Sequence, residues 1–205
     1  MIKSYVALGD SLTQGISDWG RGQANIGFAD VLANLLRANE PGLRYTNLGV
    51  GGARVADVLR SQLPQVAALA PDLVTLAVGA NDIQGTALGL FAQDYGQLLG
   101  GLRANQRSTI VVATVPNFAH LLPPQFATYR EAVQERVRAF NRIIVETAAA
   151  HEALVVDLQD RPEVQDPRNV SADGVHPNAR GYRIMAHAFA ETLNSAGFAL
   201  SLPTI

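Results

Sequence analysis

The sequence predicts a three-layer α/β/α sandwich, in which a parallel β-sheet lies between two layers of helices. Five short apolar segments of four to six residues alternate with segments that have helical periodicity. A parallel strand is covered on both faces, so it is expected to be apolar along its whole length. Charged residues make up only 17% of the 205 residues, which agrees with a sheet that is buried on both sides.

The predicted strands are short runs of apolar and β-branched residues, nearly continuous in four of the five. They cover residues 5–8, 43–48, 73–78, 110–115 and 153–158. A helical segment separates each strand from the next, and this repeated alternation favours a parallel sheet.

The predicted helices are segments in which apolar residues recur at spacings of three and four, and so share one helix face. A helix with Val55, Val58, Leu59 and Val66 on one face is expected to be interrupted or offset by Pro64, which has no N–H. The other four apolar stripes are Phe28, Val31, Leu32, Leu35 and Leu36; Leu88, Phe91, Tyr95, Leu98, Leu99 and Leu102; Tyr129, Val133, Phe140, Ile144 and Thr147; and Tyr182, Met185, Ala186, Phe189 and Leu193.

The composition favours a single domain over residues 1–205. The length fits one large domain, and the chain has no internal repeat, low-complexity linker or shift in composition. A hydrophobic content of 48% excludes a disordered or collagen-like protein. The formal net charge is −2 and no basic run is present, so no nucleic-acid partner is expected.

Cysteine is absent and histidine is sparse, which limits the kinds of catalytic and metal site that the chain can form. The chain has no cysteine, so disulfides, thiolate metal sites and a cysteine nucleophile are excluded. No two of the four histidines have the spacing of a helical metal-binding pair, and no metal or other cofactor is expected. No apolar run approaches the roughly 18 residues of a membrane-spanning helix, so integral membrane association is not expected. The N-terminus has no signal-peptide core, which favours a cytoplasmic protein unless a leader has been removed. The oligomeric state is not predicted.

Segments with residues that can take part in catalysis or bind a ligand follow four of the predicted strands. They occupy residues 9–15, 49–54, 79–82 and 173–177. Ligands of an open parallel sheet bind beyond the carboxyl ends of its strands. With the strand order 2-1-3-4-5, all four segments lie at one edge. A serine, a glycine N–H, an asparagine amide and an Asp/His pair would then converge, as in a serine hydrolase.

Each segment also has a purely structural interpretation. Ser11 and Gln14 fit a helix-capping box. Residues 81–82 are common turn residues, and a lone His176 is more often structural than catalytic. Residues 49–54 resemble a shortened dinucleotide-binding loop, although arginine stands where its third glycine is needed.

Taken together, the segments resemble the SGNH hydrolases, the superfamily of the GDSL-type esterases and lipases. Residues 9–12 read Gly-Asp-Ser-Leu, Asn47 precedes Gly52 by five residues, residues 79–82 read Gly-Ala-Asn-Asp, and residues 173–176 read Asp-Gly-Val-His. They occur in the order of the superfamily and span most of the chain. The resemblance implies a flavodoxin-like fold and a metal-free serine hydrolase that cleaves carboxylic esters.

Both the chemistry and the resemblance assign roles to three residues. Ser11 is the expected nucleophile, His176 its general base, and Asp173 the group that orients the imidazole. Asp157, at the end of the fifth predicted strand, is the alternative acid.

The resemblance implies an oxyanion hole. In addition, the side chain of Asp10 is expected to support the turn that carries Ser11. The implied donors are the backbone N–H groups of Ser11 and Gly52 and the side-chain amide of Asn81. Asp10 is expected to brace the turn by accepting backbone hydrogen bonds.

The substrate contacts are less well defined. Candidates are Trp19, Arg54 and Phe118, with core packing as the alternative for Trp19 and a surface ion pair for Arg54. The loops that would line a pocket, residues 16–27 and 116–126, are too short for a large lid. A small-molecule ester with a short-chain acyl or acetyl group is therefore favoured.

Two other functions fit the same residues. An acyltransferase or a thioesterase would use the same site. A non-catalytic phosphate- or nucleotide-binding module of flavodoxin-like fold is favoured by the glycine-rich loops, but the carboxylate of Asp10 would repel phosphate.

Overall fold

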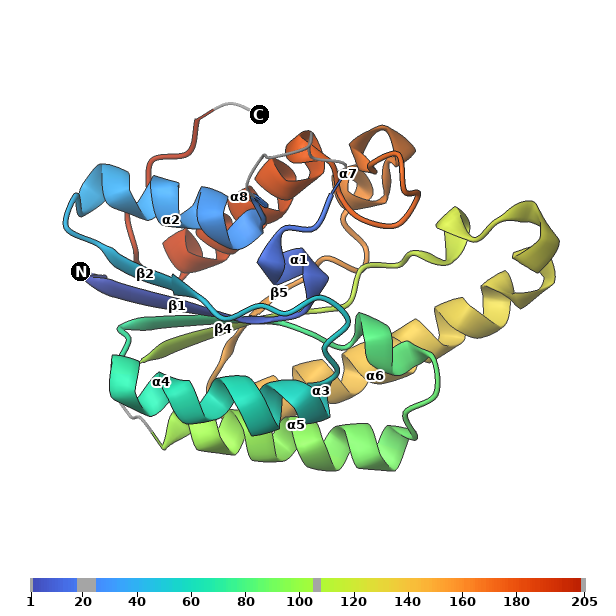
Figure 1. Cartoon of the computed structure of the whole chain (residues 1–205), viewed down its shortest axis with the longest axis horizontal. Helices are drawn as coiled ribbons and strands as arrows, with labels where there is room; N and C mark the ends of the chain where they lie inside the picture. The colour runs from blue at the N-terminus through green and yellow to red at the C-terminus, as the bar shows by residue number, and fades with distance from the viewer. Residues whose placement is uncertain (1, 18–24, 105–107, 204–205) are drawn as a thin grey trace.

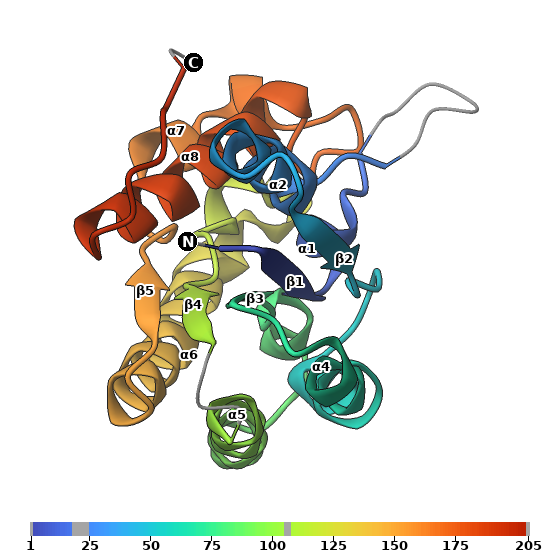
Figure 2. The same ribbon diagram turned by 90° about the vertical axis from the view of Figure 1, so that its left-hand side faces the viewer.

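A five-stranded parallel sheet with the strand order β2-β1-β3-β4-β5 forms the centre of the molecule (Figures 1 and 2). The computed structural model describes residues 2–17, 25–104 and 108–203. The predicted fold class and strand order are confirmed. The strands are β1 (Ser4–Gly9), β2 (Arg44–Asn47), β3 (Leu73–Ala77), β4 (Thr109–Ala113) and β5 (Leu154–Val156).

Helices cover both faces of the sheet (Figure 2). One layer contains α2 (Phe28–Asn39) and α8 (Ala179–Ser195), and the other contains α4 (Leu63–Leu69), α5 (Leu88–Arg103) and α6 (Arg130–Ala150). The remaining helical elements are α1 (Ser11–Gln14), α3 (Val55–Asp57) and α7 (Pro162–Gln165), the π-helical turn η1 (Val58–Gln62), and the 3-10 turns η2 (Ala80–Ile83), η3 (Ala119–Leu121), η4 (Pro124–Tyr129) and η5 (Pro167–Asn169).

Alternation along β1 explains why both faces of the sheet need a cover. Tyr5 and Ala7 belong to the core beneath α2 and α8, whereas Val6 and Leu8 belong to the core on the opposite side. All six residues of β1 are buried. The strand is therefore apolar on both faces, as the sequence predicts for a central parallel strand.

The helix around Pro64 continues past the proline. The N–H of Leu63 donates to the carbonyl of Val58, so the turn before the proline is π-helical. Pro64 follows directly in the first turn of α4, and the helical segment continues past it. The predicted offset is thus a widened turn that leads directly into α4.

The carboxyl end of β1 is shaped by Gly9. Its φ is +146°, a conformation that L side chains rarely adopt, and a Cβ atom would lie 2.1 Å from the carbonyl oxygen of Ala77. Only glycine lets the chain turn here against β3 and enter α1.

Among the described residues, no helix is long and apolar enough to cross a membrane.

Candidate active site

Ser11 is the first residue of α1 and follows directly on the turn at the end of β1. Asp10 is the N-cap of α1, and its Oδ1 accepts the N–H of Leu12 at 3.0 Å. The capping-box interpretation of Ser11 and Gln14 is therefore wrong. The side chain of Gln14 instead accepts the N–H of Gly51 at 2.6 Å, so it joins α1 to the loop after β2 and leaves the Ser11 hydroxyl available.

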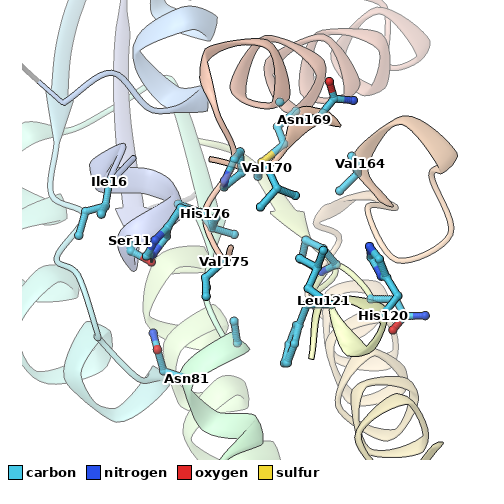
Figure 3. A pocket seen from close by; sticks show the side chains of 18 of the residues that line it. Ser11, Ile16, Asn81, His120, Leu121, Val164, Asn169, Val170, Val175 and His176 are labelled. Carbon is cyan, nitrogen blue, oxygen red and sulfur yellow. Dashed lines mark hydrogen bonds between the residues drawn. The ribbon is translucent and has the colours of Figure 1, made fainter. Parts of the chain in front are cut away.

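The structure places Ser11, His176 and Asp173 in one hydrogen-bonded chain. The Oγ of Ser11 lies 2.9 Å from Nε2 of His176, although the two residues are 165 positions apart. Nδ1 of His176 lies 2.7 Å from Oδ2 of Asp173. Figure 3 shows Ser11 and His176 side by side at one end of a cavity. Asp157, the alternative acid, accepts instead from Thr114 Oγ1 at 3.1 Å.

Asp173 is held by several donors besides the imidazole. Its Oδ1 accepts the N–H groups of Val175 and His176 and the hydroxyl of Ser171, at 2.8, 2.9 and 2.8 Å. Partial burial raises the pKa of Asp173, but these hydrogen bonds outweigh it and leave the pKa well below its ordinary value. The carboxylate is therefore ionised at neutral pH and can stabilise a positive charge on His176.

Gly52 and Asn81 are the two residues expected to form the oxyanion hole together with the N–H of Ser11. Gly52 and Asn81 line the same cavity as Ser11, and Figure 3 shows the Asn81 side chain directed toward Ser11. Nδ2 of Asn81 donates to the carbonyl of Ala53 at 3.0 Å and lies 3.5 Å from Oδ2 of Asp10. Gly52 has a φ of +78°, and a Cβ atom there would meet nothing within 4 Å. Its backbone conformation, rather than lack of space, therefore favours glycine.

Asp10 is almost completely buried, with 1% of its surface exposed. Burial and the nearby charge of Asp82 raise the pKa of Asp10 from 3.8 to about 7, although the hydrogen bond from Leu12 opposes the rise. The carboxyl is thus partly protonated near neutral pH. This weakens its repulsion of phosphate, on which the sequence argument against a phosphate-binding module depended.

The raised pKa of Asp10 predicts how stability depends on pH. The folded protein binds this proton more tightly than the unfolded chain, so Asp10 lowers the free energy of unfolding as pH rises from about 4 to about 7. Asp10→Asn removes this titration while keeping an oxygen that can cap α1. We expect the variant to gain stability relative to the native protein over that range, as measured by urea unfolding at several pH values. A difference in unfolding free energy that does not vary with pH would contradict this prediction.

The cavity beside Ser11 has a volume of about 410 Å³. It is lined mainly by apolar side chains and by a few polar ones. The loop after β4 contributes the apolar Phe118 and the polar His120. Arg54 lies outside this lining, and its guanidinium approaches the carbonyl of Gln84 at 3.5 Å. Trp19 lies outside the described residues. The apolar side chains that form the walls are Leu12, Ile16, Leu121, Val164, Val170, Val175 and Met185.

Two contacts of the site were not predicted from the sequence. The hydroxyl of Tyr182 donates to the backbone carbonyl of Ile16 at 2.6 Å and lies 3.4 Å from the backbone carbonyl oxygen of Ser11, so α8 supports the turn that carries Ser11. Ser171 supports Asp173. Tyr182 falls in the apolar stripe of α8, where a core residue is expected, and no sequence signal distinguishes a core residue from one that supports the site.

Among the described residues, no three histidine, aspartate or glutamate side chains are grouped so that they could hold a metal ion.

Comparison with known proteins gives consistent matches along the chain. The GDSL-like lipase/acylhydrolase family matches residues 7–184. An acetylxylan esterase of Geobacillus stearothermophilus is 27% identical over an alignment of 210 residues, gaps included, that covers 93% of this chain and 92% of that protein. A multidomain esterase of Ruminococcus flavefaciens is 27% identical over 125 residues, which cover 60% of this chain and 16% of that protein.

Solved structures agree with this assignment at the level of the fold. An α/β hydrolase enzyme from the metagenome of Lake Arreo, Spain, superposes with a TM-score of 0.76 at 23% identity, over 96% of this chain and 97% of that one. A variant of an acetyl-xylooligosaccharide esterase of Geobacillus gives a TM-score of 0.77 at 21% identity, over 99% of this chain and 97% of that one. The chain therefore belongs to the GDSL-like lipase/acylhydrolase family, and it is a hydrolase that acts on ester bonds.

Proposed function

We propose that Ser11, His176 and Asp173 form the catalytic triad of a carboxylic ester hydrolase. The observation that carries this proposal is the continuous hydrogen-bonded chain from Ser11 Oγ through His176 to Asp173 at the wall of the cavity. The related Geobacillus esterase supports it, because its structures include catalytic mutants in which a serine, an aspartate or a histidine is replaced by alanine. That aspartate and histidine are three residues apart, as Asp173 and His176 are.

The proposed reaction proceeds in two halves. Ser11 Oγ attacks the ester carbonyl carbon while Nε2 of His176 takes the hydroxyl proton, and the negative oxygen of the tetrahedral intermediate accepts hydrogen bonds in the oxyanion hole. His176 then passes the proton to the leaving alkoxide, which departs as an alcohol. In the second half, His176 takes a proton from a water molecule while the water oxygen attacks the acyl carbon. His176 then returns the proton to Ser11 Oγ, which releases the carboxylic acid and the free serine. Asp173 stabilises the imidazolium in both halves.

The proposed substrate is a short-chain acyl or acetyl ester. The acetylxylan esterase relative supports an acetyl group, and a cavity of about 410 Å³ is at the small end of ligand pockets. Initial rates with p-nitrophenyl acetate, butyrate and octanoate, and with acetylated xylo-oligosaccharides, test this choice. We expect the acetate and butyrate to react fastest. A preference for the octanoate would show that the apolar walls bind a longer chain.

Hydrolysis, acyl transfer and thioester cleavage share this site, and the products distinguish them. In the presence of a competing alcohol we expect free acid as the main product, whereas a transferase would yield the new ester. A thioester substrate tests the third activity. Tight equilibrium binding of FMN would support the phosphate-binding alternative, but nothing in that alternative requires the hydrogen bond between Ser11 and His176.

Asn81→Ala tests the oxyanion hole. Loss of one preorganised donor is expected to lower kcat by a factor of about 100 to 1,000, with little change in KM, because the negative oxygen exists only in the transition state and intermediate. Gln84→Ala is the matched control, since Gln84 lines the same cavity and has no proposed role in the reaction. Similar losses in both variants would contradict the assignment of Asn81.

A further inference from the structure

Gln62 is a polar residue in a position that belongs to the core. The residues of the α3–η1–α4 segment that face the sheet are Val55, Val58, Gln62 and Val66, and Gln62 is only 1% exposed. Figure 2 shows this segment on the face of the sheet opposite α2 and α8. Burial of an amide group without hydrogen bonds destabilises the folded state. A glutamine in the middle of an apolar stripe therefore points to specific partners.

Both partners of Gln62 belong to one residue, Gly9. The N–H of Gly9 donates to Oε1 of Gln62 at 2.8 Å, and Nε2 of Gln62 donates to the carbonyl of Gly9 at 2.8 Å. Gly9 is the last residue of β1 and lies two positions before Ser11. The side chain of Gln62 thus binds the peptide groups on both sides of Gly9, and the second of these leads directly to Asp10.

The helix adopts an uncommon form where it supplies this side chain. Gln62 is the last residue of the π-helical turn Val58–Gln62. Such turns are rare and occur frequently at functional sites. The amide is therefore presented by a turn that differs from the regular helix of α4.

A second buried amide makes the same contact at the end of β4. Asn141 on α6 is 4% exposed. Its Oδ1 accepts the N–H of Val115 at 2.7 Å, and its Nδ2 donates to the carbonyl of Val115 at 2.8 Å and to Oε1 of Gln159 at 2.8 Å. The next three residues, 116–118, all line the cavity. Asn141 thus supports the cavity-lining residues 116–118, and Gln62 supports the turn from Gly9 to Ser11.

We propose that Gln62 is a positioning residue for catalysis, and that it sets the alignment of the Ser11 hydroxyl and N–H through the backbone of Gly9. The inference rests on the proposed function of Ser11. A nucleophile and an oxyanion donor displaced by a fraction of an ångström lose transition-state stabilisation while the substrate still binds. Loss of the Gln62 contacts therefore lowers kcat, whereas loss of the Asn141 contacts displaces cavity walls and raises KM.

The test compares two variants that remove the same kind of contact. Gln62→Met and Asn141→Leu keep the approximate size of each side chain and remove the hydrogen bonds to the backbone. Val66→Ala, on the same buried stripe as Gln62, controls for lost stability in this helix. Hydrolysis of p-nitrophenyl butyrate is measured below the unfolding transition of each protein, and kcat is calculated per site counted from the burst of p-nitrophenolate, so that unfolded molecules do not contribute.

We expect Gln62→Met to lower kcat by about tenfold with KM within twofold of the native value. Asn141→Leu is expected to raise KM severalfold with kcat nearly unchanged, and Val66→Ala to change neither. If Gln62→Met does not fold, Gln62→Glu is measured in the same way, because its carboxylate keeps the acceptor for the Gly9 N–H but repels the Gly9 carbonyl.

An unchanged kcat in the folded Gln62 variant would overturn the inference, and so would an equal loss in Val66→Ala. These outcomes leave the proposed function intact as long as Ser11→Ala is inactive. Full activity of Ser11→Ala would instead disprove the proposed function itself.

Discussion

Replacement of Ser11 by alanine is expected to lower kcat/KM for p-nitrophenyl acetate by at least about a thousandfold. The variant lacks the oxygen that is proposed to form the acyl-enzyme, whereas the cavity and the proposed oxyanion donors remain in place. Residual hydrolysis would come from binding and from the oxyanion hole alone. The burst of p-nitrophenolate that accompanies acylation should also disappear, which separates the loss of the nucleophile from slower deacylation.

The fold is expected to tolerate this change. The N-cap of α1 is Asp10 rather than Ser11, so Ser11→Ala retains the cap and should unfold within a few degrees of the native protein. Ser195→Ala serves as a control, because Ser195 is the exposed last residue of α8, its hydroxyl donates to the carbonyl of Glu191, and it does not line the cavity. Retention of more than about a tenth of the native rate in Ser11→Ala would exclude Ser11 as the nucleophile.

Replacement of Asp173 by asparagine is expected to lower kcat by a factor of about 1,000 to 10,000. A neutral amide neither stabilises the imidazolium nor ensures that Nδ1 of His176 carries the proton, and the wrong tautomer leaves no acceptor for the Ser11 proton. The shape of the side chain is retained. The loss should therefore fall on kcat, measured with the same ester under saturating conditions, and not on KM.

Asp157→Asn is the matched control, since the sequence offers both carboxylates as the third member of the triad. Asp157 contacts Thr114 and the N–H of Gln159, while Asp173 contacts His176. We expect Asp157→Asn to keep its activity within a fewfold of the native enzyme. A larger loss in Asp157→Asn than in Asp173→Asn would show that the acid has been misassigned.

The sheet was predictable because its signals are local. Runs of apolar residues separated by helical stripes predict buried parallel strands, and each predicted strand lies within two residues of an observed one at either end. The segment around Pro64 was less predictable. A proline in a helical stripe is compatible with a break, a kink or a π turn, and the choice depends on how the following helix packs against the sheet.

The candidate site was predictable in its residue types because chemistry restricts them. Ser11, Asn81, Asp173 and His176 each follow a predicted strand, where ligands bind in this class of sheet. The supporting contacts were not predictable in the same way. Tyr182 and Asn141 lie in amphipathic helices and give no separate signal, whereas Gln62, at a core position between Val58 and Val66, carried a signal that only its buried partners explain.

The sequence by itself determined the parallel α/β sheet, the absence of cysteine chemistry and the four segments that carry the candidate site. These are properties of composition and of short-range periodicity. Tertiary structure alone decided that Nε2 of His176 meets the hydroxyl of Ser11, 165 positions away, and that the turn at Gly9 is held by a buried amide from another layer. Both contacts join groups that lie far apart in the chain and meet only when the helices and loops pack on the sheet, so no local pattern records them.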